Sequence, residues 1–269
     1  MSEHRYSRQS FLGADAQRLI EQAVIGVVGL GGGGGHVVQQ LAHVGFLDYR
    51  LFDGDCAGES NLNRLVIATS ADAIAQAPKV ELARRRILSI QSTACVEVFQ
   101  CRWQNAPEAL RECDIVFGCI DGFAERRELE ICCRRYLVPL IDIGMDVHIA
   151  GDEPPRMGGQ VILSMPGAPC MQCLGFLSEA SLAREAAQYG DAGSRPQVVW
   201  PNGVLASTAI GIAVDLLTDW TRSLRDVVYL MYDANRGIVT PHPRLTYHDG
   251  SACPHFPMDQ VGSPEFKKL

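Results

Sequence analysis

Short apolar runs alternate with longer segments rich in helix formers through the first 144 residues of the chain. The apolar runs contain many β-branched residues and most end at a glycine or an acid, which is typical of strands buried in a parallel sheet. This alternation predicts an α/β fold with a doubly wound, Rossmann-like sheet and right-handed crossovers. We expect strands at residues 23–30, 49–53, 95–101, 114–121 and 137–144, and helices at residues 36–43, 79–90 and 125–136.

The pattern changes after Gly144, where the remaining apolar runs are typical of antiparallel strands and a hairpin. We expect strands at residues 158–165, 227–234 and 237–248, a polar stretch at residues 178–195 and one long helix at residues 204–220. No linker composition separates the two parts. The sequence therefore predicts that the parallel sheet continues into antiparallel strands within a single domain, residues 1–269, with halves of about residues 1–145 and 146–255.

A glycine-rich turn follows the first predicted strand. Gly29, Gly31 and Gly34 fit the pattern G-x-G-x-x-G between a strand and a helix. Glycines there permit a tight turn and close approach of the backbone to phosphate, and the helix N-terminus supplies N–H donors. Asp53 ends the next strand, where an acid can bind a ribose hydroxyl. The pattern predicts a nucleotide site rather than a tight turn without a ligand, but it leaves NAD, FAD and ATP open.

Polar residues beyond the second predicted strand favour ATP. Asn61, Arg64 and Lys79 follow that strand, and Asp121 ends a later one. A triphosphate needs cations that neutralise its β and γ phosphates while the α-phosphate is attacked. Ligands of parallel sheets bind beyond the carboxyl ends of the strands, so a carboxylate at Asp121 can hold Mg²⁺ there. Each residue alone is more often a surface charge, but together they favour ATP with Mg²⁺.

Seven segments occur in an order that is typical of one family. They are RYSRQ, VVGLGGGG, FDGD, SNLNR, the segment around Lys79, DIVFGCID and PCMQCL near residue 170. On these segments, from about residue 5 to about residue 255, the chain resembles the ThiF/MoeB family, which is related to the ubiquitin-activating enzymes. The resemblance implies an adenylyltransferase that uses ATP to activate the C-terminal carboxylate of a small ubiquitin-like or sulfur-carrier protein with a Gly-ending tail, releasing pyrophosphate.

The resemblance also implies roles for single residues. Asp53 would bind the ribose of ATP, and Asp121 would lie at the Mg²⁺. The phosphates would be contacted by Asn61, Arg64 and Lys79.

Two arginines and two departures complete the comparison with the family. Arg8 matches an arginine that reaches the γ-phosphate of the neighbouring subunit, which implies a homodimer, and Arg126 matches a further arginine of the pattern. Gly122 and Glu130 stand where asparagines are usual, which affects the expected fine positioning more than the chemistry.

The expected reaction needs no general base, because a C-terminal carboxylate has a pKa of about 3.5 and is already anionic at neutral pH. It needs screening between two anions and an orientation that lets pyrophosphate leave. An acyl-adenylate hydrolyses easily, so water must be excluded. The polar stretch at residues 178–195 is the predicted covering loop, and it could also clamp the partner's tail. The alternative is a connection without function.

Cysteines near the end of the chain predict a metal site. A C-x-x-C pair in PCMQC is half of a tetrahedral zinc site. Related enzymes supply the other half from a second C-x-x-C, but here Phe256 occupies the place of the fourth cysteine. We predict structural Zn²⁺ in a Cys₃His site, against the alternative of plain reduced thiols. The candidate ligands are Cys170, Cys173, Cys253 and either His255 or His248, of which His255 is taken as the fourth ligand.

The chain lacks a cysteine where family members that form thioesters or persulfides carry one. Residues 174–204 contain none. We therefore expect adenylation only, with the activated tail passed directly to a conjugating enzyme or a sulfur donor. Cys132 and Cys133, on a predicted helix, are interpreted as thiols of the core or surface.

Composition limits the partners and the compartment. The formal net charge is −7 without a basic block, which argues against nucleic acid as the main partner. No run of about 18 uninterrupted apolar residues and no apolar signal core is present, so no membrane association is expected. The ten cysteines are scattered through predicted strands and helices, which suits reduced thiols in the cytoplasm.

Two other functions stay open. An NAD-dependent oxidoreductase shares the glycine pattern, but it would need a substrate domain with a proton-transfer group. A catalytically inactive scaffold subunit would share the fold. Retention of the four candidate catalytic residues argues against a scaffold: Arg8, Arg64, Lys79 and Asp121.

Overall fold

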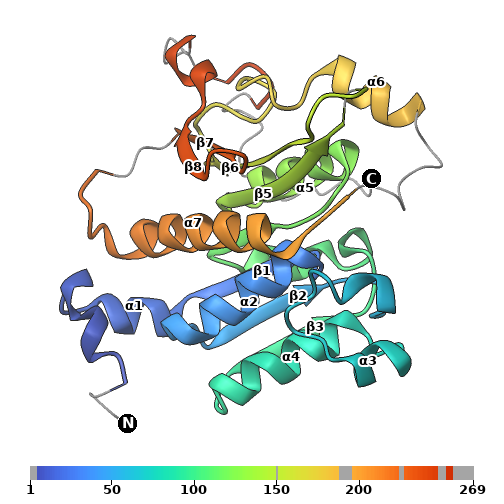
Figure 1. Ribbon diagram of the computed structural model, residues 1–269. Coiled ribbons are helices and arrows are strands. Elements are labelled where there is room, and N and C mark those ends of the chain that lie inside the picture. Colours follow the sequence, from blue (N-terminus) through green and yellow to red (C-terminus); the bar gives the residue numbers. More distant parts are fainter. Residues whose placement is uncertain (1–4, 150, 188–195, 224–226, 248–252, 257–269) are drawn as a thin grey trace.

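One sheet of eight strands runs through the part of the chain that the computed structural model describes, residues 5–149, 151–187, 196–223, 227–247 and 253–256. The strand order is β3-β2-β1-β4-β5-β6-β7-β8 (Figure 1). Pairs from β3 to β5 are parallel and pairs from β5 to β8 are antiparallel, which confirms the predicted fold class. The strands are β1 Val24–Val28, β2 Asp48–Phe52, β3 Cys95–Phe99, β4 Ile115–Gly118, β5 Leu140–His148, β6 Arg156–Ser164, β7 Val227–Asp233 and β8 Ile238–Pro241.

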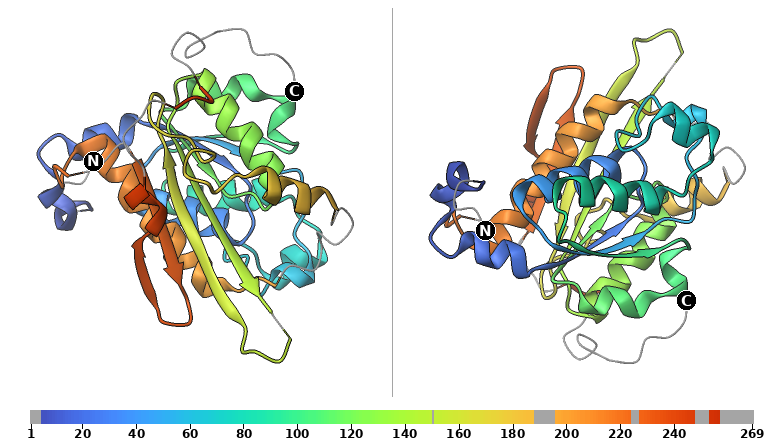
Figure 2. Two further views of the ribbon diagram at one scale, coloured as in Figure 1. Left: turned by 90° about the horizontal axis from the view of Figure 1, so that it is seen from above. Right: turned by 90° about the horizontal axis from the view of Figure 1, so that it is seen from below.

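Helices cover both faces of this sheet. Figure 2 shows α2, α4 and α7 on one face and α5 on the other. The described α-helices are α1 Ala16–Gln22, α2 Gly32–Val44, α3 Ser70–Ile74, α4 Lys79–Ile90, α5 Phe123–Arg135, α6 Glu179–Ala187 and α7 Val199–Thr218. Short 3₁₀ helices are η1 Ser7–Leu12, η2 Glu59–Asn61, η3 Trp103–Asn105, η4 Pro107–Glu112 and η5 Pro243–Tyr247.

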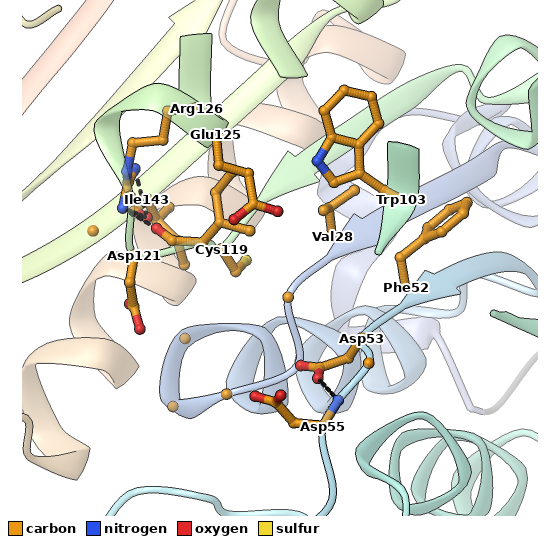
Figure 3. Close-up of a pocket in the computed structure, with 18 of the residues that line it drawn as sticks. Val28, Phe52, Asp53, Asp55, Trp103, Cys119, Asp121, Glu125, Arg126 and Ile143 are labelled. Atoms are coloured by element: carbon orange, nitrogen blue, oxygen red, sulfur yellow. Dashed lines mark hydrogen bonds between the residues drawn. The ribbon is translucent and has the colours of Figure 1, made fainter. Parts of the chain in front are cut away.

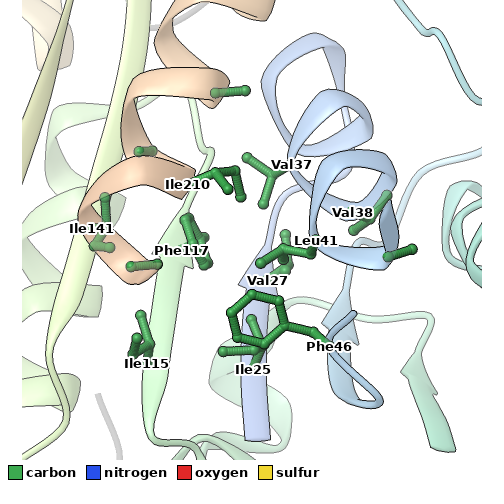
Figure 4. Close-up of a cluster of buried hydrophobic side chains, with 14 of the residues drawn as sticks. Ile25, Val27, Val37, Val38, Leu41, Phe46, Ile115, Phe117, Ile141 and Ile210 are labelled. Carbon is green, nitrogen blue, oxygen red and sulfur yellow. The ribbon is translucent and has the colours of Figure 1, made fainter. Parts of the chain in front are cut away.

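Strands β1 to β7 contribute to two hydrophobic cores, because successive side chains of a strand point to opposite faces. Val27 belongs to the core under α2 and α7, whereas Val28 belongs to the core under α5. In Figure 4 the first core packs Leu41 of α2 and Ile210 of α7 over Phe117 of β4. These side chains hold both helices, and therefore their N-termini, in fixed positions on the sheet.

Three C-terminal elements differ from the sequence-based expectation. The strand expected at residues 237–248 ends at Pro241 and is followed by the 3₁₀ helix η5, because Pro241 and Pro243 have no N–H to donate to a strand ladder. The long helix begins at Val199 rather than at residue 204. By length and composition it could cross a membrane, but 56% of its most apolar window is buried and it packs against α2 and β5, as a core helix does. The predicted covering loop contains a helix, α6, whose Leu182 lines the cleft described below, while residues 188–195 of that loop lie outside the described residues.

Candidate active site and metal centre

A cleft of about 1830 Å³ opens at the carboxyl ends of the parallel strands. Loops after these strands meet there, which is where α/β sheets bind ligands. Most residues predicted to bind a nucleotide line the cleft: Gly29, Gly31, Asp53, Asn61, Arg64, Lys79 and Asp121. Gly34, which was predicted with them, does not line it, and neither does Arg8, which was predicted to act in a neighbouring subunit.

The glycine turn allows close packing of backbone on backbone. Gly29 has a φ of +87°, and a Cβ there would lie 2.5 Å from the carbonyl oxygen of Cys119. A Cβ on Gly34 would collide with the carbonyl oxygen of Gly29, so Gly34 lets α2 pack on the turn instead of facing the cleft. Since α2 begins at Gly32, the N–H groups of its first turn have no partner within the helix. The turn therefore presents N–H donors and the positive end of the helix dipole to the cleft.

Asp53 and Lys79 lie side by side in the cleft. Asp53 accepts hydrogen bonds from the N–H groups of Leu30 at 2.7 Å and Asp55 at 2.8 Å, and Figure 3 marks the second bond. Burial raises the pKa of Asp53, and Lys79 opposes this shift. Lys79 Nζ lies 2.7 Å from Asp55 Oδ2 and 3.9 Å from Asp53 Oδ1. The Lys79 side chain is 10% exposed and that of Asp55 is 75% exposed, so the ammonium can exchange Asp55 for a bound phosphate while Asp55 turns to solvent.

Arg64 supplies a second cation. Its Nη1 donates to Ser60 O at 2.8 Å and to Asn63 Oδ1 at 3.0 Å, and within the described residues it pairs with no carboxylate. Asn61 Oδ1 accepts from the N–H of Gly58 at 3.0 Å and so shapes the loop that carries Arg64. No carboxylate of the described residues therefore competes with an anionic ligand for this guanidinium.

Carboxylates occupy the opposite wall. Asp121 follows β4, is exposed, and accepts from Gln197 Nε2 at 3.1 Å. Glu125, in the first turn of α5, also lines the cleft (Figure 3), and burial raises its pKa while Arg102 opposes the shift. Carboxylate oxygens are ligands that Mg²⁺ prefers. Sequence analysis missed Glu125, although an acid one turn after Asp121 at a helix start was a usable signal.

An apolar wall lies near Asp53. Val28, Phe52 and Trp103 form it (Figure 3), and Phe52 stacks on Phe99 with ring centroids 4.5 Å apart. Ligand sites combine such apolar surface with a few polar groups.

The segment before α7 closes one side of the cleft. Asn63 Nδ2 donates to Gln197 O at 2.9 Å, and the Gln197 side chain reaches Asp121. Asn202, in the first turn of α7, is buried, and a Cβ on Gly32 would lie 2.5 Å from its Nδ2. The N-terminus of α7 therefore packs directly on the glycine turn.

A buried ion pair joins α5 to β5, beside the carboxyl end of β4. Arg126 donates to the Asp142 carboxylate and to the carbonyl oxygens of Ile120 and Ile143. Figure 3 shows Arg126 beside Ile143, and the Arg126 and Asp142 side chains are 6% and 0% exposed. Burial raises the pKa of Asp142 to about 6, and Arg126 opposes the shift. Ile120 directly precedes Asp121, so Arg126 holds the backbone that carries the Asp121 carboxylate.

Arg8 lies away from the cleft of its own chain. Its 3₁₀ helix η1 packs at the far end of α2, where Gln9 Nε2 donates to Val44 O at 2.9 Å. The 13 residues of α2 span about 20 Å between this contact and the glycine turn. Arg8 is exposed there and does not take part in the cleft of its own chain.

Four candidate metal ligands converge beside α5. The Sγ atoms of Cys170 and Cys173 are 3.6 Å apart, and those of Cys173 and Cys253 are 3.5 Å apart. Nδ1 of His255 lies 3.4 Å from Cys170 Sγ and 3.3 Å from Cys173 Sγ. A Zn²⁺ ion with Zn–S distances of about 2.3 Å places tetrahedral sulfur ligands about 3.8 Å apart, so the donor set fits zinc. The alternative ligand His248 lies outside the described residues.

Comparisons with known proteins agree with this geometry. The chain is 30% identical over 237 residues to the molybdopterin-synthase adenylyltransferase of Escherichia coli K12, covering 86% of this chain and 88% of the relative. It is 29% identical over 264 residues to the SAMP-activating enzyme E1 of Haloferax volcanii, covering 96% and 91%. The crystal structure of E. coli MccB with ATP superposes with a TM-score of 0.73 at 19% identity, over 90% of this chain and 71% of MccB, a likeness that concerns the fold alone. The model of the ThiF family matches residues 5–253, and the chain therefore belongs to the ThiF family, as the resemblance predicted.

Proposed function

We propose that this chain uses ATP to adenylate the C-terminal carboxylate of a small ubiquitin-like or sulfur-carrier protein with a Gly-ending tail. The observation that carries the proposal is the convergence of Lys79, Arg64 and Asp121 on the glycine turn in one cleft. Relatives named as adenylyltransferases and as a SAMP-activating enzyme support the same reaction class. They favour it over a nicotinamide-dependent oxidoreductase.

The residues of the cleft suit attack of one anion on another. A carboxylate oxygen forms a bond to the α-phosphorus of ATP, the bond from that phosphorus to the bridging oxygen breaks, and pyrophosphate leaves with the electron pair. Lys79 and Arg64 neutralise charge on the leaving phosphates, and the glycine turn orients them through N–H groups. Asp121, with Glu125 nearby, would hold Mg²⁺, which adds positive charge between the phosphates when bound.

The test of this function is exchange of labelled pyrophosphate into ATP. We expect exchange only when a small protein that ends in Gly-Gly is added, and none when its last residues are removed. Tails that support exchange identify the partner. Absence of exchange with every tail, despite tight ATP binding, would favour the inactive scaffold. Because residues 174–204 lack a cysteine, we expect the product to be the adenylate without a thioester, ready for a conjugating enzyme or a sulfur donor.

We propose a homodimer in which Arg8 completes the cleft of the neighbouring subunit. The support is its exposed position, far from its own glycine turn. Arg8→Ala and Lys79→Ala proteins should each be inactive. An equal mixture of the two should recover about a quarter of wild-type exchange, because about half of the dimers are mixed and one of the two sites in each mixed dimer is intact. Mixing that restores nothing, although mixed dimers form, would contradict the shared site.

We also propose that Cys170, Cys173, Cys253 and His255 bind structural Zn²⁺. Their donor atoms all lie within 4.8 Å of one another, which supports one ion. Metal analysis of purified protein should give about one zinc per chain. Cys173→Ser should lower this zinc content and leave the cleft residues proposed for adenylation in place. Folded protein without zinc contradicts the assignment. None of the ten cysteines is in a disulfide, which supports the proposal of a reducing, cytoplasmic location.

A further inference from the structure

One face of α5 carries three buried charges, Arg126, Glu130 and Arg134, which are 5%, 2% and 2% exposed. Residues four apart lie on the same side of a helix, so these side chains form a continuous charged face. Buried charges persist only when they are paired or hydrogen-bonded. Arg126 finds its partners at the cleft, whereas Glu130 and Arg134 find their hydrogen-bond partners at the candidate metal site.

Glu130 holds the backbone of the metal loop. Its Oε1 accepts from the N–H of Met171 at 2.8 Å and from Ser164 Oγ at 2.5 Å. Met171 directly follows the ligand Cys170, and Ser164 ends β6. Glu130 therefore ties the first ligand of the site to the sheet through one carboxylate oxygen.

Arg134 contacts both segments that supply ligands. Its Nη1 donates to Ala168 O at 2.7 Å and its Nη2 to Pro169 O at 2.9 Å, immediately before Cys170. Its guanidinium carbon also lies 5.0 Å from the centroid of the Phe256 ring, within the range of a cation–π contact. Phe256 follows His255, so Arg134 joins the first and the last ligand of the site without using either side chain.

We propose that Glu130, Arg134 and Phe256 position the metal ligands and replace the anchoring that a fourth thiolate would give. The two departures from the family pattern, Glu130 for an asparagine and Phe256 for a cysteine, are thereby explained by one network centred on Arg134. This inference rests on the proposed zinc site and is independent of adenylation. Groups that orient metal ligands from outside typically change metal affinity 10- to 100-fold.

The experiment compares zinc affinities by competition with a coloured chelator. Arg134→Gln and Phe256→Ala should each bind zinc about 10- to 100-fold more weakly than wild type. Glu130→Gln should do the same, and the conservative change Arg134→Lys should recover part of the loss. Arg135→Gln is the matched control, because it neutralises the next arginine of α5, which makes none of these contacts. Visible spectra of the Co²⁺-loaded proteins should show distorted ligand geometry in Arg134→Gln, Phe256→Ala and Glu130→Gln. The spectrum of the control Arg135→Gln should match that of wild type.

Melting temperatures with and without zinc separate positioning from packing. A packing role alone lowers the melting temperature of loaded and metal-free protein equally and leaves zinc affinity unchanged; that result overturns the proposal. If Arg134→Gln does not fold, Phe256→Ala decides the matter, since it removes a half-buried ring and leaves the core contacts of Arg134 intact. Wild-type protein without metal overturns both this inference and the zinc site, whereas pyrophosphate exchange still tests adenylation separately.

Discussion

Asp121→Asn is expected to slow ATP–pyrophosphate exchange by about 10²- to 10³-fold, comparable to the loss of one preorganised electrostatic contact in an enzyme site. Asparagine keeps the size of the side chain and an oxygen that can accept from Gln197, but it removes the negative charge that would hold Mg²⁺. The exchange rate should be measured at saturating ATP over a range of Mg²⁺ concentrations. We expect the Mg²⁺ dependence to move to higher concentrations as the rate falls.

Asp114→Asn provides the matched control. Asp114 lies at the opposite end of β4, where its Oδ2 accepts from the N–H of Val24 at 2.8 Å. Asp114 does not line the cleft, so the exchange rate of Asp114→Asn should equal that of wild type. Wild-type exchange in Asp121→Asn would remove Asp121 from the metal role and make Glu125 the remaining carboxylate to test.

The parallel half of the fold was predictable because its signals are local. Apolar runs of β-branched residues mark the buried strands, and the glycine turn fixes where the first strand ends and α2 begins. Loops after parallel strands meet at one edge, so the order of Asp53, Lys79 and Asp121 along the chain was enough to predict that they share a cleft. Local pattern and sheet topology together therefore gave most of the candidate site.

The start of α7 was mispredicted because its first five residues include Pro201 and Gly203, which are normally signs of a loop. Proline is tolerated in a first helical turn, since the N–H groups there have no partner within the helix. The α6 error has a similar origin: its polar sequence was interpreted as a loop, although alanines, glutamates and an arginine favour a helix.

Buried charges were the features that sequence alone predicted least. In the sequence, Glu130 and Arg134 look like ordinary charged residues of a helix. Only the packing of the metal loop on α5 shows that they are buried. The same holds for Asp142, which lies between the apolar residues Ile141 and Ile143 of β5. Such residues depend on contacts between distant segments, whereas the helical spacing of four residues gives only their common face.

The second large effect is expected when the ion pair of Arg126 and Asp142 is broken. Arg126→Met should lower the free energy of unfolding by about 3–5 kcal/mol at pH 7, because it leaves the Asp142 carboxyl buried without its counter-charge. It also removes the bonds that hold Ile120 O and Ile143 O, so exchange activity should fall with stability. Chemical denaturation at several pH values measures the effect.

The pH dependence follows from the raised pKa of Asp142, about 6 in the folded protein against about 3.9 unfolded. A raised pKa gives stability that is complete below the unfolded value and is lost as the pH rises through the folded value. Loss of Arg126 raises the folded pKa of Asp142 further, so the deficit of Arg126→Met should be smallest near pH 5 and grow toward pH 8. The double variant Arg126→Met/Asp142→Leu removes both charges and should recover most of the stability with no such pH dependence, since apolar replacement of a whole buried pair is often neutral. A double variant as unstable as Arg126→Met would show that the carbonyl bonds of Arg126, and not the uncompensated carboxyl, cause the loss.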